Sequence, residues 1–131
     1  MIKKLLILTM FLTLLSSTAK GDEQRVRMAL KAANGGDADS QNKLGVYYEI
    51  GASVEQNDVE AVKWFRMAAD QGHGEAMFNL GEMYEQGRGV PKSLEEAVAL
   101  YKKSCRNGCK CACKKYRLLT GEEGEAPEVP F

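Results

Sequence analysis

The 131-residue sequence has one histidine, His73, one tryptophan and three prolines, and its 18 basic residues equal its 18 acidic residues in number. A lone histidine has no second imidazole with which to share a metal ion, and we expect it in a surface turn. The sequence also lacks a P-loop, a G-x-S-x-G nucleophile motif and an H-E-x-x-H motif. Because positive charge is not in excess, a nucleic-acid-binding surface is not expected. These absences predict a protein that is not an enzyme and needs neither a cofactor nor a metal.

Only one long apolar run is present, and it lies at the N-terminus. Two lysines precede the apolar residues 5–15, and small polar residues follow them. This layout is typical of a secretory signal peptide, and the run is too short for a comfortable membrane span. We predict a signal peptide over residues 1–19, cleaved after Ala19, with cleavage after Gly21 and a retained anchor as the alternatives. The mature chain is then expected to be periplasmic or secreted, without membrane insertion.

An internal repeat organises the remaining chain. An offset of 36 residues aligns the sequence with itself without a gap. The matched pairs include Leu44-Gly45 with Leu80-Gly81, Tyr48 with Tyr84, Gly51 with Gly87, Ala61-Val62 with Ala97-Val98, and Gly72 with Gly108. In the first helix of a unit, apolar residues recur at i, i+4, i+7 and i+8, which is typical of one helix face, and glycine follows the helix. The pattern predicts an all-α chain of repeated αα-hairpins.

The repeat register also predicts the segments of the chain. These are an N-terminal capping half-repeat over residues 20–36, full repeats over 37–72 and 73–108, a C-terminal capping helix over 109–120, and an acidic tail over 121–131. Half-repeats at both ends suit an array whose units are stacked on each other. The tail has four glutamates, two prolines and no basic residue, so we expect it to be disordered.

Small and aromatic residues indicate how the helices pack. Gly45 and Gly81 lie inside predicted helices, where glycine costs about 1 kcal/mol relative to alanine. They therefore indicate places where two helix backbones approach closely, and Ala61 and Ala97 are the expected partners. The aromatic residues at repeated positions are predicted to be core: Tyr48, Trp64, Phe65, Tyr84 and Tyr101.

Both units contain Leu-Gly-x-x-Tyr-x-x-Gly, followed by an Ala-Val pair, an aromatic residue and a closing glycine. On these motifs, the chain resembles Sel1-like repeats, relatives of tetratricopeptide repeats, over residues 25–117. The resemblance implies a right-handed superhelical solenoid with two full repeats and half-repeat caps. It also implies an adaptor or scaffold that binds other proteins. The chain departs from the family pattern at Ser104-Cys105, where Ala-Ala is expected, and at Lys114, where an apolar residue is expected.

The resemblance implies that the first helix of each unit lines a concave face. Carried over by position, that face consists of Asn42, Val46, Glu49, Phe78, Glu82, Glu85, Lys114 and Leu118. Their spacing of i, i+4 and i+7 puts them on one side of their helices. We predict that they bind a protein partner in the cell envelope or in a host, and the alternative is a solvated face that binds nothing specific. An exposed Phe78 would favour binding.

The cysteines form the pattern C-x3-C-x-C-x-C from Cys105 to Cys113. In an exported chain they are expected to be paired, and four cysteines allow three pairings. The spacing of Cys105 and Cys113 is similar to that in secreted cysteine-rich Sel1-like proteins of Helicobacter type, and this resemblance implies a bridge between these two. Cys109 and Cys111 have no counterpart in that pattern. They either form a C-x-C disulfide or remain as a metal or redox site in the envelope.

An enzymatic alternative also comes from the resemblance. Some cysteine-rich Sel1-like proteins are described as penicillin-binding or β-lactamase-like, so an activity of that class is implied as the rival to protein binding. Serine enzymes of that class use an S-x-x-K motif. The tetrad from Ser104 to Asn107 does not supply it.

Overall fold

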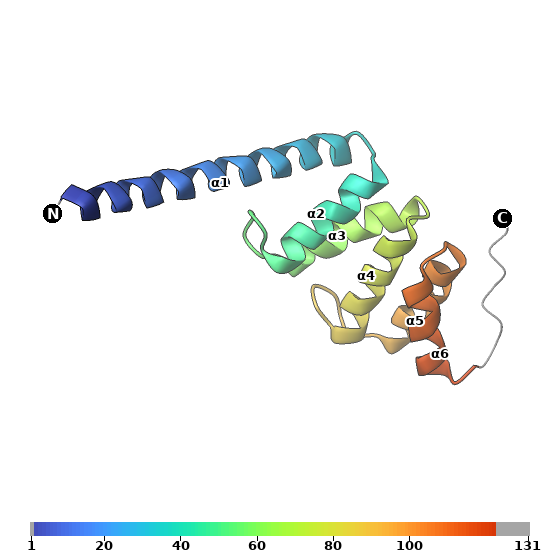
Figure 1. The fold of residues 1–131 in the computed structure, drawn as a ribbon. Helices are drawn as coiled ribbons and strands as arrows, with labels where there is room; N and C mark the ends of the chain where they lie inside the picture. Colours follow the sequence, from blue (N-terminus) through green and yellow to red (C-terminus); the bar gives the residue numbers. More distant parts are fainter. Residues whose placement is uncertain (1, 123–131) are drawn as a thin grey trace.

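The computed structural model describes residues 2–122, except for the side chains of residues 8–20. Six helices follow one another in this part of the chain, and it contains no strand. The helices are α1 (Ile2–Asn34), α2 (Ala38–Ile50), α3 (Asp58–Asp70), α4 (Gly74–Gln86), α5 (Leu94–Arg106) and α6 (Lys110–Thr120). The predicted all-α repeat solenoid is confirmed (Figure 1). The predicted tail falls mostly on residues 123–131, which lie outside the described part.

The helices pack as consecutive hairpins. Helices α2 and α3 form the first full repeat, and α4 and α5 form the second. The C-terminal part of α1 packs on α2, and α6 packs on α5, so a half-repeat lies at each end. We call α2, α4 and α6 the first helices, because each occupies the first position of its unit.

Helix α1 is longer than the predicted half-repeat. It continues without a break through residues 2–19 of the predicted signal peptide, and its N-terminal part projects beyond the other helices in Figure 1. Ile2 and Leu5 are 79% and 68% exposed, whereas Val26 and Ala33, nearer the array, are buried. No helix in the described residues is long and apolar enough to span a membrane. The signal peptide remains a prediction.

Residues in the loops set where the helices begin and end. Four N-cap side chains accept a backbone N–H from the first turn of their helix: Asp37, Asn57, His73 and Ser93. Such a bond satisfies one of the free N–H groups at a helix start. Gly51 and Gly87 end α2 and α4 with φ of 71° and 68°, a left-handed conformation that favours glycine.

The two interior glycines pack against aromatic rings. A Cβ atom on Gly81 would lie 2.7 Å from a ring carbon of Tyr101, and one on Gly45 would collide with the ring of Phe65. Both glycines are therefore contact points between helices, but each faces an aromatic ring rather than the second backbone and the alanines, Ala61 and Ala97, that were expected. A ring needs more room than a methyl group, which is why only glycine fits opposite it.

Burial agrees with most of the predicted core. Trp64, Phe65 and Tyr101 are buried. Tyr48 and Tyr84 pack on the core but are half-buried, and the Tyr84 hydroxyl accepts a hydrogen bond of 3.0 Å from Arg66. A tyrosine at the core edge keeps its polar end in reach of such a donor.

Candidate functional site

The eight residues predicted to bind a partner lie on the three first helices, and we call them the candidate face. Helix α2 carries Asn42, Val46 and Glu49, α4 carries Phe78, Glu82 and Glu85, and α6 carries Lys114 and Leu118. Asn42 is buried, Lys114 and Leu118 are exposed, and the other five are half-buried. The face is thus most accessible at its α6 end.

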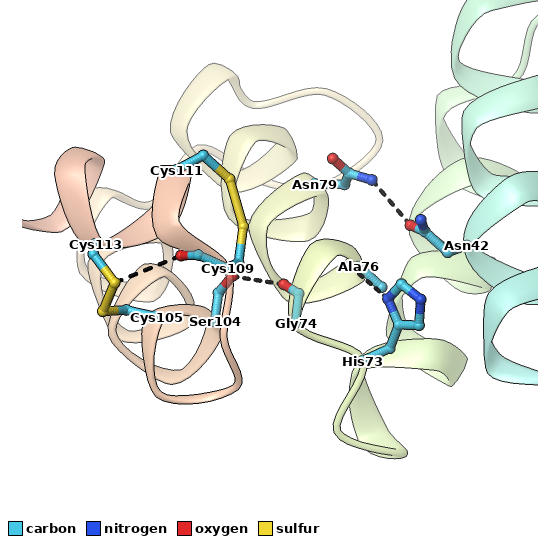
Figure 2. The surroundings of a disulfide bond; sticks show 10 residues. All are labelled: Asn42, His73, Gly74, Ala76, Asn79, Ser104, Cys105, Cys109, Cys111 and Cys113. Atoms are coloured by element: carbon cyan, nitrogen blue, oxygen red, sulfur yellow. Dashed lines mark hydrogen bonds between the residues drawn. A yellow bond between two sulfur atoms is a disulfide. The ribbon is translucent and has the colours of Figure 1, made fainter. Parts of the chain in front are cut away.

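Asn42 is engaged in packing between repeats. Its side-chain oxygen accepts a hydrogen bond of 2.9 Å from Asn79 Nδ2, which joins α2 to α4 (Figure 2). Asn42 is only 6% exposed, so it links the first helices and offers little surface to a partner. Asn79 was not among the predicted residues of the face, because it follows Phe78 directly in the chain and falls outside the i, i+4, i+7 spacing that selected the others.

Phe78 is also partly used within the protein. Its ring lies 5.5 Å from that of Tyr101 at an interplanar angle of 44°, a tilted arrangement that aromatic pairs favour. The condition that Phe78 be exposed is not met, because it is half-buried. Phe78 covers one side of a core tyrosine and presents only part of its ring to solvent.

Arg88, in the loop after α4, binds two acidic residues of the first repeat. Its guanidinium lies 3.0 Å from the Glu49 carboxylate and 2.8 Å from that of Asp58. Hydrogen bonding to Asp58 raises the pKa of Arg88 further above its ordinary value. Glu49 of the candidate face is therefore neutralised from within the chain.

Glu85 has two donors. The Tyr101 hydroxyl donates a hydrogen bond of 2.6 Å to Glu85 Oε2, and Lys115 Nζ lies 3.0 Å from the same oxygen. Partial burial works to raise the pKa of Glu85, but the bonds from Tyr101 and Lys115 outweigh it, so this pKa is lowered. Burial, together with Glu85, raises the pKa of Tyr101. The carboxylate joins α4, α5 and α6.

Lys115 was another residue that sequence reasoning missed, because Lys114 was chosen instead. Lys114 is exposed, whereas its neighbour makes the ion pair. The sequence did contain a signal for this column, because the 36-residue repeat places three polar residues at equivalent positions: Lys43, Asn79 and Lys115. Two members of this column, Asn79 and Lys115, contact a neighbouring first helix or a residue on it.

Glu82 differs from the other carboxylates of the face. Its side chain makes no hydrogen bond and no ion pair within the part of the chain that the structure describes. Burial raises the pKa of Glu82; Lys115 and Arg88 oppose this effect, and Glu49 and Glu85 add to it. Charged groups from three helices and the loop after α4 thus surround one half-buried, unpartnered carboxyl group.

A hollow of about 290 Å³ lies beside the α2 end of the candidate face. Its lining comprises Asp39, Asn42, Lys43, Val46, Tyr47, His73 and Glu75. His73 is half-buried rather than a simple surface-turn residue. Its Nδ1 accepts the Ala76 N–H at 3.1 Å, and its Nε2 lies 2.9 Å from Asp39. The histidine thereby starts α4 and contacts the first turn of α2.

All four cysteines are in disulfides, so the prediction that they are paired is confirmed. The structure joins Cys105 to Cys113, with Cα atoms 4.7 Å apart, and Cys109 to Cys111, with Cα atoms 5.5 Å apart (Figure 2). The first bridge closes a loop of nine residues, worth about 2.5 kcal/mol in the chain-entropy estimate. With both pairs formed, no thiol is free to ligate a metal ion.

Ser104 serves as a packing contact. It is fully buried, and its Oγ donates a hydrogen bond of 2.6 Å to the Gly74 carbonyl at the start of α4. In Figure 2 this bond joins α5 to the start of α4 within the second repeat. A hydroxyl held in this way is not available as a nucleophile, so Ser104 gives the enzymatic alternative no support.

Comparisons with known proteins add to this geometry. The family model for the Sel1 repeat matches residues 38–73 and 74–109. A solved Sel1 repeat protein from Oxalobacter formigenes is similar, with 35% identity and a TM-score of 0.72, covering 79% of this chain and 42% of that chain. The protective antigen c5321 of uropathogenic Escherichia coli, described as displaying an SLR fold, is 34% identical with a TM-score of 0.72, covering 74% of this chain and 21% of that chain.

A third solved structure agrees in fold alone. Helicobacter pylori cysteine rich protein B is 22% identical with a TM-score of 0.66, covering 77% of this chain and 90% of that chain. A comparison with curated proteins finds no match. The present chain spans less than half the length of the first two similar structures.

Proposed function

Since the chain belongs to the Sel1 repeat family, we propose that it is a protein-binding adaptor whose partner docks on the candidate face of α2, α4 and α6. The observation that carries this proposal is Glu82. A half-buried carboxylate without a hydrogen-bond partner is unfavourable in the free protein. A partner that supplies a cationic or N–H donor group would remove that cost on binding.

The surroundings of Glu82 support binding rather than simple solvation. Glu49 and Glu85 are held by Arg88 and by Tyr101 with Lys115, so their side chains are already ordered. A partner that contacts them loses less conformational entropy than it would on a mobile surface. The exposed Leu118 adds an apolar contact at the α6 end of the face.

Export to the periplasm or beyond is the second part of the proposal. It rests on the apolar N-terminal run after two lysines and on the disulfides, which rarely persist in a reducing cytosol. N-terminal sequencing of the protein recovered from its own cell envelope or medium should give Lys20 or Asp22 as the first residue. A chain that still begins with Met1 would overturn this part.

Site-specific cross-linking tests the binding face. A photoreactive amino acid replaces Leu118, on the candidate face, or Ala99, an exposed residue of α5 whose neighbour Ala97 faces the core. After irradiation in extract, position 118 should yield a defined protein adduct that position 99 does not. Equal adducts at both positions, or adducts only at position 99, would contradict docking on the first helices.

Two substitutions that each remove one negative charge then test the role of Glu82 with the partner so identified. Glu82→Gln should weaken binding about tenfold, as expected when one charged hydrogen bond of about 1.4 kcal/mol is lost. The same exchange at Glu95, an exposed residue on α5, should leave the affinity unchanged. Equal affinities for the wild type and Glu82→Gln would remove Glu82 from the interface.

A further inference from the structure

The two disulfides lie in different surroundings, although Cys109 and Cys111 both lie between Cys105 and Cys113 in the sequence. Cys105 is 4% exposed and its partner Cys113 is half-buried, so this bond lies at the seam between α5 and α6. Cys111 is exposed and Cys109 is half-buried in the turn before α6. A thiol in solution can therefore reach the Cys109–Cys111 bond, whereas packing covers much of the other.

The start of α6 favours the reduced form of the exposed pair. Cys109 is the N-cap of this helix and, unlike the four other N-caps described above, its side chain makes no cap hydrogen bond. Its sulfur is instead bonded to Cys111, in the first turn. Once reduced, Cys109 would present a thiolate to the free N–H groups of the helix start, which lowers the pKa of a cysteine thiol and makes it a good leaving group.

The helix segments that flank the pair in the sequence are basic, which acts in the same direction. Helix α6 contains four basic residues and no acidic one: Lys110, Lys114, Lys115 and Arg117. The last turn of α5 adds Lys103 and Arg106. Lys115 is paired with Glu85, but the others make no ion pair in the described part of the chain. Positive charge near a cysteine stabilises its thiolate.

We propose that Cys109 and Cys111 form a redox-active disulfide that oxidises dithiols in other proteins, while the Cys105–Cys113 bond stays closed and holds the cap. A substrate thiolate attacks Sγ of the exposed Cys111. A mixed disulfide forms, the Cys109–Cys111 bond breaks, and Cys109 leaves as the thiolate. This proposal does not depend on the protein-binding face.

The second half of the exchange completes the transfer. The other substrate thiolate attacks the substrate sulfur of the mixed disulfide, and Cys111 leaves as a thiolate. The substrate loses two electrons and two protons and gains a disulfide, while the Cys109–Cys111 pair becomes a dithiol. A small-molecule disulfide of the oxidised glutathione class then reoxidises this pair by the same two steps.

Redox titration of the mature chain separates the two bonds. The protein is equilibrated at graded ratios of reduced to oxidised glutathione, free thiols are trapped with N-ethylmaleimide, and peptides are mapped by mass. Cys109 and Cys111 should become labelled at a ratio at least about tenfold less reducing than that needed for Cys105 and Cys113. Simultaneous opening, or earlier opening of Cys105–Cys113, would overturn the proposal.

Single variants test the leaving group. In Cys111→Ser, the pH dependence of alkylation should give Cys109 a pKa below the ordinary thiol value of about 8.5. In the matched variant Cys109→Ser, Cys111 should form the mixed disulfide with oxidised glutathione. An ordinary or raised pKa for Cys109 would refute the role assigned to the helix start.

An activity assay completes the test. A synthetic dithiol peptide with oxidised glutathione as terminal oxidant should form its disulfide faster with the wild type than with Cys109→Ser/Cys111→Ser. Because this double variant keeps the Cys105–Cys113 bridge, circular dichroism should show an unchanged helix content. Equal rates with a folded double variant would refute catalysis by this pair.

Discussion

The two full repeats use different kinds of contact at equivalent positions of the packing between helices. In the first repeat, Ala69 of α3 and Met77 of α4 belong to one buried apolar cluster. Thirty-six residues later, the same two positions are Cys105 of α5 and Cys113 of α6, and a disulfide joins them. Helix α4 is covered by further helices, whereas α6 has 11 residues and only Ala112 buried. A terminal helix with so little buried surface gains more from a covalent bond than from an apolar contact.

The residue just before this position also differs between the repeats. Ala68 is fully buried in the first repeat, and Ser104 replaces it in the second, where its hydroxyl bonds the Gly74 carbonyl. At these two positions, apolar contacts of the first repeat are thus replaced by a disulfide and a hydrogen bond near the C-terminal end of the array.

Overpacking a glycine should have the largest effect and should affect both repeats alike. Gly81→Leu forces a side chain into the ring of Tyr101, and Gly45→Leu does the same at Phe65. Each should lower the free energy of unfolding by about 3 kcal/mol, measured by urea denaturation. Ala99→Leu, on an exposed part of α5, is the control and should have little effect. An unchanged midpoint for Gly81→Leu would contradict the packing of α4 on α5.

Removing the terminal bridge should rank second and should depend on redox conditions. Cys105→Ala with Cys113→Ala should lower the free energy of unfolding by about 2.5 kcal/mol when the wild type is oxidised. With reductant present, the two proteins should melt at nearly the same temperature. Peptide mapping of the wild type that links Cys105 to Cys109 or Cys111 would show a different pairing.

Making the second repeat more like the first at Ser104 should have a smaller effect. Ser104→Ala restores the residue type of Ala68 but removes the hydroxyl that donates to the Gly74 carbonyl. We expect a loss of about 1 kcal/mol in chemical denaturation. The reverse exchange, Ala68→Ser, sharpens the comparison, because it buries a hydroxyl among the apolar residues of the first repeat. If Ser104→Ala stabilises the protein, the hydrogen bond is not needed at the end of the array.

Changing Glu82 should have the smallest effect on stability, and its sign depends on pH. Glu82 occupies the position of Val46 in the first repeat. Because its pKa is raised in the folded protein, folding favours the protonated form, so its charge destabilises the fold as pH rises above the unfolded pKa. Glu82→Gln should therefore raise the stability at pH 7 by no more than about 0.5 kcal/mol and leave it unchanged below pH 4. A loss of stability at pH 7 would mean that the carboxylate makes a favourable contact.

The fold was predictable because it depends on many residues that repeat in phase. Leu44, Gly45 and Tyr48 recur at Leu80, Gly81 and Tyr84, and each pair occupies equivalent places in its hairpin. The candidate face was predictable only as a set of positions. The 36-residue repeat aligns Asn79 with Lys115, but this alignment alone did not select them over Asn42 and Lys114. Which of two adjacent polar side chains bonds across a helix pair depends on side-chain direction, and a linear pattern does not encode it.

His73 shows the same limit. Its flanking residues predict a turn, and a single histidine forms no repeated motif that would indicate a contact. Its role becomes visible only when Asp39, 34 residues earlier in the chain, lies beside its ring. Nonlocal polar contacts of this kind depend on the final packing of helices rather than on local sequence.

Arg88 has a consequence for how the molecule unfolds. It belongs to the second repeat, yet it holds Glu49 and Asp58 of the first. In a one-dimensional array, stability is approximately the sum of the stability of each unit and a coupling term for each pair of neighbours. Contacts that cross from one unit to the next add to the coupling term alone. The pairs made by Arg88 therefore discourage states in which one repeat is folded and the other is open, and they favour a single transition in which both repeats fold together.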